Sequence, residues 1–322
     1  MFSLQPFNRT VSLLSSMLLM GVLWGICRIP QANFLMVCFT FLSSALLVEI
    51  PSFNDRLKRA FSMALFASTA QFLIAISAEL LFWQLILSGI FAYYTFLFFS
   101  DHRAACIVMI TGYLSLFAPP GFLPGISRSI DIWAGFLVIM AVTTFDNASC
   151  PSLTHPPQVA SFSPGEALIL ALELSTGFLL FRLLRLQQGP WIMLTLLFIN
   201  MNCRPGTSEK RTAFQRISGV PLGIIIGGLL LGTFGRMDYR FIYFIPFIGT
   251  AGFWFLYNYN NFFVFSIIFM VALTLFSDWA AGTGNRYNFW ESFFSRSVST
   301  LLGALPEVLW SQWADGKKEK SV

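Results

Sequence analysis

Twelve apolar segments follow one another along the chain, and they limit its fold more than any other feature. They span about 10–27, 31–48, 60–78, 80–99, 104–118, 132–145, 165–181, 190–202, 217–235, 239–257, 261–277 and 297–313. Several are shorter than the roughly 20 residues of a straight membrane span, which leaves their borders open. The residues are 56% hydrophobic and 11% charged, with a mean hydropathy of +0.70. The sequence therefore predicts an all-α polytopic membrane protein with about twelve transmembrane helices.

A polar segment, Asp146–Gly165, separates two sets of six apolar runs. It contains four prolines and no lysine or arginine. We interpret it as a cytoplasmic linker, because it is too short to form a domain. The predicted domains are an N-terminal six-helix repeat at 1–145, a C-terminal six-helix repeat at 166–313 and a charged cytoplasmic tail at 314–322.

The end of this linker contains the signals of a helix start. Ser163 is the predicted N-cap, and Pro164 occupies the first helical position. Glu166 follows Ser163 at the spacing of a capping box, in which the two residues bond to each other's backbone amides.

The two halves resemble each other in the order of their polar residues. Lys58-Arg59 precedes the third run as Gln215-Arg216 precedes the ninth. Arg128 and Arg296 are each separated by six residues from a glycine, Gly135 or Gly303. This order predicts a duplication, and six helices per half predicts parallel repeats related by an axis along the membrane normal.

Gly189–Phe234 is predicted to form a helix, a short basic hairpin and a second helix that begins near Ile217. Arg216, Gly219 and Gly223 are spaced three and four residues apart, so they share one helix face. Gly223 and Gly227 form a G-x-x-x-G pattern, for which close helix packing is the favoured explanation.

Loop charges predict the orientation. With the N-terminus inside, the cytoplasmic segments hold twelve of the lysines and arginines and the outer segments hold eight. Both termini are therefore predicted to be cytoplasmic. Val11–Cys27 is interpreted as a retained first helix, because no small-x-small cleavage site follows it.

Charged residues inside apolar runs are the candidates for function. Three carboxylates are candidates for proton coupling, with Glu173 the strongest because it lies about 15 Å into the bilayer; the others are Asp131 and Asp278. Four arginines could form a positive ring that binds a carboxylate: Arg59, Arg128, Arg216 and Arg296. The alternatives are structural ion pairs, in particular Arg128 with Asp131, and contacts with lipid headgroups.

No catalytic, metal-binding or nucleotide-binding pattern is recognisable. The five cysteines and two histidines are isolated, without metal-ligand or disulfide spacing. No phosphate-binding loop is present, so neither ATP nor another cofactor is expected, and nothing indicates a nucleic acid partner. The sequence therefore favours a non-enzymatic protein.

Residues 189–305, and more faintly 30–145, resemble the FUSC family of fusaric acid resistance and aromatic acid exporter proteins. The resemblance consists of Pro190-Trp191 opening a helix, a basic turn, Arg216-x-x-Gly219-x-x-x-Gly223, and later Arg296 to Gly303. Val220 and Pro221 replace the threonine that commonly follows the first glycine in that family. The large cytoplasmic domain of many members is also missing, so the chain is similar to a compact variant.

The resemblance implies two six-helix bundles in a bacterial inner membrane. It also implies proton-coupled export of small aromatic or hydrophobic organic acids, with a periplasmic adaptor protein as partner. One alternative is a passive organic-anion channel of the same fold, and another is a membrane assembly or lipid-binding protein without transport. The sequence leaves open the substrate and the oligomeric state, including a homo-oligomer.

A cysteine introduced at Ala160 tests the predicted topology. In intact cells an Ala160→Cys variant should react with a membrane-impermeant maleimide only after permeabilisation, because the linker is predicted to be cytoplasmic. Labelling from outside without permeabilisation would show that the orientation is inverted.

Overall fold

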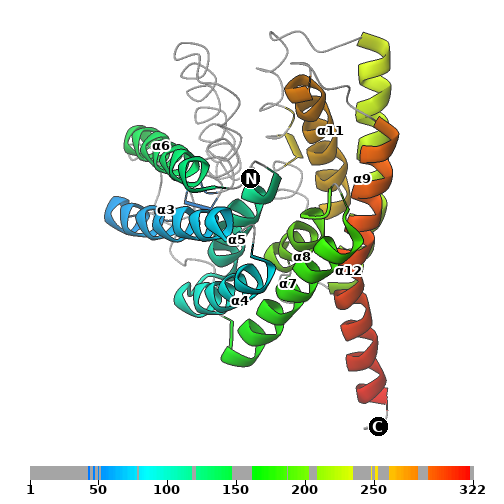
Figure 1. The fold of residues 1–322 in the computed structure, drawn as a ribbon, viewed down its shortest axis with the longest axis horizontal. Helices are drawn as coiled ribbons and strands as arrows, with labels where there is room; N and C mark the ends of the chain where they lie inside the picture. The colour runs from blue at the N-terminus through cyan, green and yellow to red at the C-terminus, as the bar shows by residue number, and fades with distance from the viewer. Residues whose placement is uncertain are drawn as a thin grey trace, which may run out of the picture. The chain divides into compact units, whose positions relative to one another are not determined.

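All the elements that the computed structural model describes are helical (Figure 1). The described residues are 52–77, 80–117, 121–146, 162–186, 188–202, 209–234, 261–281 and 289–319, with short pieces at 43, 46–47, 50, 248 and 251–252. Within them, five helices are long and apolar enough to cross a membrane: Phe53–Ile76, Leu81–Phe98, Phe122–Ala141, Pro164–Leu184 and Arg211–Thr233. Trp191–Met201 and Phe262–Leu275 are shorter apolar helices. The chain is an α-helical, multi-pass membrane protein.

Nine predicted apolar runs coincide with the nine α-helices of the described residues. The run at 10–27, and most of the runs at 31–48 and 239–257, lie outside those residues. The chain divides into two compact units, Met1–Thr176 and Gly177–Val322. The twelve-helix count, the predicted domains and the predicted repeat stay predictions.

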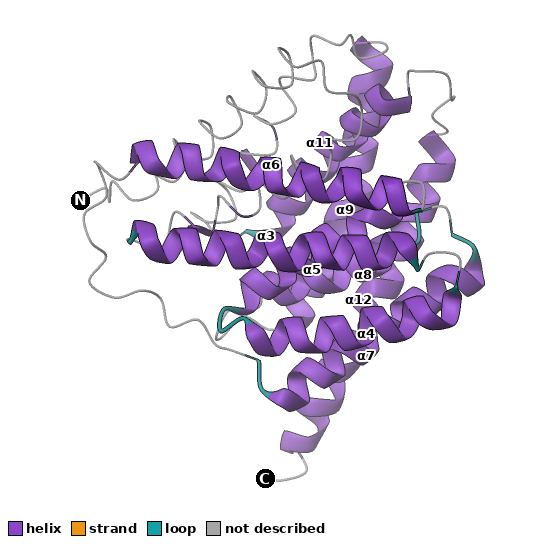
Figure 2. Cartoon of the chain, turned by 60° about the vertical axis from the view of Figure 1, so that its left-hand side comes forward, coloured by secondary structure: helices purple, strands orange, loops and turns teal. Residues whose placement is uncertain are grey.

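In the first unit, helix α3 (Phe53–Ile76) is the common neighbour of the other helices. It packs against α4 (Leu81–Phe98), α5 (His102–Leu114) and α6 (Phe122–Asp146) (Figure 2). A short 3-10 helix, Ser115–Phe117, follows α5. Small buried side chains on α3, Ala60, Ala64 and Ala67, let its neighbours approach closely.

The predicted start of α7 (Pro164–Leu184) is confirmed. The Ser163 backbone amide and hydroxyl donate to Glu166 Oε2, each at 2.8 Å, and the Glu166 amide donates back to Ser163 Oγ at 3.3 Å. This is the reciprocal bonding of a capping box.

The second unit contains α8 (Trp191–Asn202), α9 (Glu209–Phe234), α11 (Phe262–Ala281) and α12 (Phe289–Glu319). Helix α9 packs against α11 and α12, and α8 packs against α12 and α9 (Figure 1). Trp191 to Ile199 is buried at every position, so α8 is enclosed on all sides. Pro221 lies inside α9 and Pro306 inside α12.

The glycines of α9 lie directly against α11, which confirms that they serve helix packing. A Cβ atom on Gly223 would lie 2.5 Å from the Ile267 carbonyl oxygen and 2.7 Å from Met270 Cβ. A Cβ atom on Gly219 would lie 2.8 Å from Ser266 Cβ, and a Cβ atom on Gly227 would lie 2.8 Å from Thr274 Cβ. Because Arg216 shares this helix face, the glycines also hold it against α11.

Four helices begin well before their predicted apolar runs, and the first is α3, which begins at Phe53 instead of 60. α6 begins at Phe122 instead of 132, α9 at Glu209 instead of Ile217, and α12 at Phe289 instead of 297. Hydropathy marks only the apolar part of a helix, whereas Glu, Lys, Arg and Gln are good helix formers that extend it. The predicted basic hairpin is therefore shorter, and Arg128, Arg216 and Arg296 lie within helices.

Substituting alanine at two glycines of α9 tests the close packing. Gly223→Ala should lower the stability of the purified protein by about 1–3 kcal/mol, because the added methyl group meets backbone atoms of α11. Gly232→Ala is the matched control, since no atom lies within 4 Å of the added Cβ. Thermal unfolding in detergent measures both, and equal stability of the two variants would contradict the packing argument.

Candidate functional site

Four arginine side chains are buried within the described helices. Arg56, Arg128, Arg216 and Arg296 are exposed by 1%, 5%, 0% and 4%. Removing a guanidinium from water costs several kcal/mol unless other groups stabilise its charge. The neighbours of each arginine therefore indicate whether its charge is already compensated.

Arg216 lies at the packed junction of α8, α9 and α11. Its Cζ atom is 4.8 Å from the centre of the Phe198 ring, and its Nη1 atom is 3.5 Å from Ser266 Oγ. Nε and Nη2 are buried and have no hydrogen-bond partner among the described residues. A guanidinium over a ring face gains a cation–π attraction, but the ring has no oxygen or nitrogen atom that could accept the paired N–H groups of the arginine. Arg216 therefore presents two free donor atoms in an apolar setting.

Phenylalanine rings cluster around Phe198, the ring that faces this guanidinium group. Phe198 of α8 meets Phe265 and Phe269 of α11 at centroid distances of 6.2 and 5.3 Å. Along α11, Phe262, Phe265 and Phe269 stack at 5.6 and 5.4 Å, with ring planes 26° and 25° apart. Such rings offer faces and edges that attract another aromatic ring.

Arg296 of α12 is held differently, near the beginning of α8. Its Nε atom is 3.4 Å from Gln188 Oε1, which also accepts the Trp191 indole N–H at 3.2 Å. The Arg296 guanidinium lies 5.7 Å from the centre of the Trp191 ring. The Gln188 backbone amide donates to Ser295 Oγ at 3.0 Å, which ties this cluster to α12.

Residues 175–310 match the family described as fusaric acid resistance protein-like. The C-terminal half of the chain is therefore similar to this family. The match confirms the resemblance that the Arg216 and Arg296 motifs indicated, and it includes α8, α9, α11 and α12. The family suggests a role in membrane transport.

A curated protein of Neisseria gonorrhoeae, named uncharacterized protein ORF2, is also similar. It is 29% identical over 153 residues, which cover 46% of this chain and 34% of that protein. The chain thus matches about a third of the length of this curated relative. No solved structure matches the chain significantly.

Glu307 is a buried carboxylate of the FUSC-like region that the sequence analysis missed. It is 6% exposed in α12, and its Oε1 atom accepts a hydrogen bond of 2.6 Å from the Asn200 side-chain amide of α8. The same amide donates to the Leu196 carbonyl oxygen at 3.0 Å. The signal was available, because Glu307 lies inside the apolar run 297–313 just as Glu173 lies inside 165–181.

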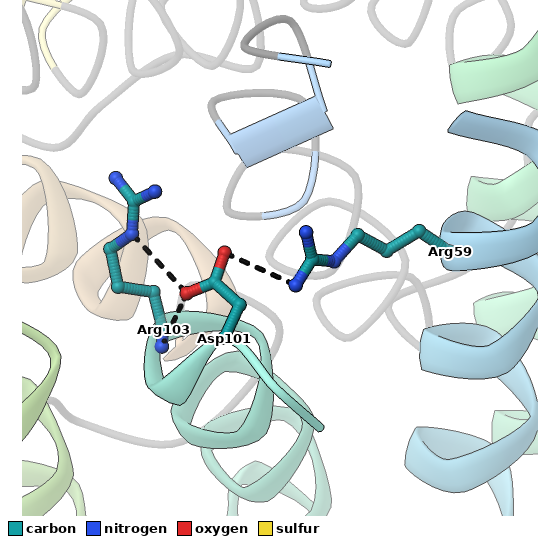
Figure 3. A network of polar contacts seen from close by, with 3 residues as sticks. All are labelled: Arg59, Asp101 and Arg103. Atoms are coloured by element: carbon teal, nitrogen blue, oxygen red, sulfur yellow. Dashed lines mark hydrogen bonds and ion pairs between the residues drawn. The ribbon is translucent and has the colours of Figure 1, made fainter. Parts of the chain in front are cut away.

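In the first unit, Arg59 forms an ion pair with Asp101, so a protein carboxylate already occupies this candidate anion-binding side chain (Figure 3). Arg59 Nη2 is 3.3 Å from Asp101 Oδ2, and Arg103 Nε is 3.4 Å from Asp101 Oδ1. Asp101 also caps α5, because its Oδ1 atom accepts the Arg103 backbone amide at 3.0 Å. The sequence analysis overlooked Asp101, although an aspartate before a helical segment is a common N-cap signal.

The other candidate residues lie on α6, α7 and α11. Arg128 and Asp131 are both buried on α6 and interact electrostatically, as their spacing predicted. Glu173 is half-buried on α7, and Asp278 belongs to α11. The predicted ring draws Arg59 and Arg128 from the first unit and Arg216 and Arg296 from the second, and it stays a prediction.

An Asp101→Asn substitution tests the network around Arg59. Asparagine keeps the N-cap acceptor but removes the charge, so the variant should lose about 1–3 kcal/mol of stability. Combined with Arg59→Gln, the loss should be smaller than the sum of the single losses, as measured by thermal unfolding. Strictly additive losses would show that the ion pair contributes no stability.

Proposed function

We propose that this protein is an efflux transporter of a bacterial inner membrane that exports small aromatic or hydrophobic organic acids. The observation that carries the proposal is Arg216, a fully buried arginine with two donor atoms free of described partners. A buried charge without a protein partner is costly inside a membrane, and reversible binding of an anionic ligand is a reason to retain it.

A carboxylate is the anion that suits Arg216 best. The guanidinium group is planar, and its parallel N–H bonds match the two oxygens of a carboxylate. Nε and Nη2 lie on one edge of the guanidinium, and both are without a described partner. A substrate carboxylate would therefore complete the hydrogen bonding of Arg216 and neutralise its charge.

The surrounding rings favour an aromatic or otherwise apolar body on that carboxylate. Phe198 faces the guanidinium, and Phe265 and Phe269 lie within ring-contact distance of Phe198. An aromatic acid would place its ring among these side chains and its charge on Arg216. Arg296 beside Trp191 offers a second place of similar chemistry in the same unit.

Proton coupling and an adaptor belong to the same proposal. Export of an anion across a membrane needs a driving force, and an intramembrane carboxylate such as Glu173 supplies a group that gains and loses a proton. Asp131 and Asp278 are further candidates. A periplasmic adaptor protein would complete the path, with both termini of the chain in the cytoplasm.

The proposed duplication gains support from the buried faces of α3 and α9. Arg216, Val220, Gly223, Ile224 and Gly227 are buried on α9, and the buried residues Arg56, Ala60, Met63, Ala64 and Ala67 stand 160 positions earlier on α3. The packing partners also correspond, because α3 packs against α5 and α6, and α9 packs against α11 and α12. This register makes Arg56, instead of Arg59, the counterpart of Arg216.

Substitutions at two arginines of α9 test the proposed function. Arg216→Gln should weaken the binding of benzoate about 10- to 100-fold, because a hydrogen bond to a charged group contributes about 1.5–3 kcal/mol. Arg211→Gln is the matched control, since Arg211 is exposed on the same helix. Titration calorimetry on the purified protein measures affinity, and benzoate efflux from vesicles measures transport.

Two further comparisons separate the proposal from its rivals. Benzamide, which has the same ring without the charge, should bind the wild type and Arg216→Gln with equal affinity. Benzoate affinity that is unchanged by Arg216→Gln would contradict the proposed site. Benzoate flux that ignores an imposed pH gradient in the wild type would favour a passive anion channel.

A further inference from the structure

We propose that Glu307 is a proton-carrying carboxylate of this transporter, connected along the buried α8–α12 contact by the hydroxyl groups of Thr195, Ser299 and Thr300. This inference rests on the proposed function and adds to it a residue and a route. It differs from the expectation that Glu173 alone carries the proton.

The position of Glu307 is the first observation. Its carboxylate is buried between α12 and α8, in an apolar run of the sequence. The described hydrogen bond comes from Asn200, a neutral amide that donates most strongly to a carboxylate and can still donate to the carbonyl oxygen of a protonated carboxyl group. This contact therefore persists through a change of protonation.

A row of hydroxyl groups is the second, independent observation. Arg296, Ser299, Thr300, Gly303 and Glu307 are all buried on one face of α12. Opposite them on α8 is Thr195, whose Cβ lies 3.0 Å from a Cβ built on Gly303. The hydroxyl oxygens of Thr195, Ser299 and Thr300 are buried without a hydrogen-bond partner among the described residues.

These hydroxyl groups suit a proton route. Serine and threonine inside helices ordinarily donate to a carbonyl one turn earlier, as Thr111 and Ser175 do in this chain. Buried polar groups without a protein partner are places where ordered water binds. The row extends from Glu307 toward Arg296, about 16 Å along the helix axis.

The charged neighbours of Glu307 are few within the described residues. Helix α8 contains no charged residue, and its Asn200 amide donates to Glu307. On α9, the other helix packed against α12, the described charged side chains are the buried Arg216 and the exposed Arg211. On α12 itself, Arg296 shares the face of Glu307.

The chemical step is a reversible protonation. The Glu307 carboxylate accepts one proton, carried along the hydroxyl row by water, and forms an O–H bond. It later releases that proton to water on the other side of the membrane, and no other covalent bond changes. One proton crosses per cycle, which couples the pH gradient to the anion bound at Arg216.

A Glu307→Gln substitution in the full chain tests the proposal, with Glu291→Gln as the matched control. Glutamine still accepts the Asn200 hydrogen bond but cannot titrate, whereas Glu291 is an exposed carboxylate of the same helix. In vesicles, Glu307→Gln should bind benzoate and exchange it without a pH gradient like the wild type. It should lose the acceleration that an imposed pH gradient gives to the wild type and to Glu291→Gln.

Two further variants keep the test decisive if Glu307→Gln fails to fold. Asn200→Leu removes a donor that stabilises the ionised carboxylate, so the pH of half-maximal transport should shift upward. Ser299→Ala combined with Thr300→Val should slow pH-driven transport and leave benzoate affinity unchanged. An unchanged pH profile in Asn200→Leu together with full pH-driven transport in the hydroxyl variant would overturn the proposal.

A substrate-independent readout separates this inference from the proposed function. Infrared difference spectra between acid and alkaline pH should contain the carbonyl stretch of a protonated carboxyl group, which Glu307→Gln should lack. If the wild type moves no benzoate but this band is present and lost in the variant, the proposed function fails and Glu307 still titrates. Full pH-driven transport by Glu307→Gln, or its loss in Glu173→Gln alone, would assign the proton to another residue.

Discussion

The direct contact of the α9 backbone with α11 is the interaction on which the second unit depends. Gly219, Gly223 and Gly227 have no side chain, so atoms of α11 lie close to where their Cβ atoms would be: Ser266 and Thr274 side-chain atoms at Gly219 and Gly227, and the Ile267 backbone at Gly223. Apolar side chains gain little by leaving lipid, so helices in a membrane associate through close packing and hydrogen bonds. Arg216 is buried beside this close contact and lies over the Phe198 ring. Its charge therefore lacks a described counter-charge, which a bound anion would supply.

Two arginines of the first unit have a carboxylate neighbour, whereas Arg216 of the second unit has none among the described residues. In the first unit, Arg59 forms an ion pair with Asp101, and Arg128 interacts electrostatically with Asp131, which offsets part of its charge. In the second unit, the described neighbours of Arg216 are a ring and a hydroxyl group. Compensated charges stabilise a fold, whereas an uncompensated one favours binding. This contrast is why the proposed site lies in the unit that matches the family.

Periodic and local signals in the sequence predicted much of this fold. The apolar runs identified the described helices, the Ser163 and Glu166 spacing predicted the start of α7, and the glycine spacing predicted a packed face on α9. Hydropathy could not place the helix starts, because polar residues such as those of Glu209–Arg216 extend a helix without being apolar. Contacts between distant residues, such as Asn200 with Glu307 and Arg59 with Asp101, depend on tertiary packing that no local pattern encodes.

The prolines inside α9 and α12 have a mechanical consequence. Proline has no amide hydrogen, so the carbonyl groups of Ile217 and Leu302, four residues before Pro221 and Pro306, lack their usual helical donor. Each helix is therefore softer to bending next to a buried charge, since Arg216 precedes Pro221 by five residues and Glu307 follows Pro306 directly. A change in the charge of Arg216 or Glu307 therefore acts where its helix bends most easily. A small change in the bend angle there would displace the far end of the helix by a larger distance.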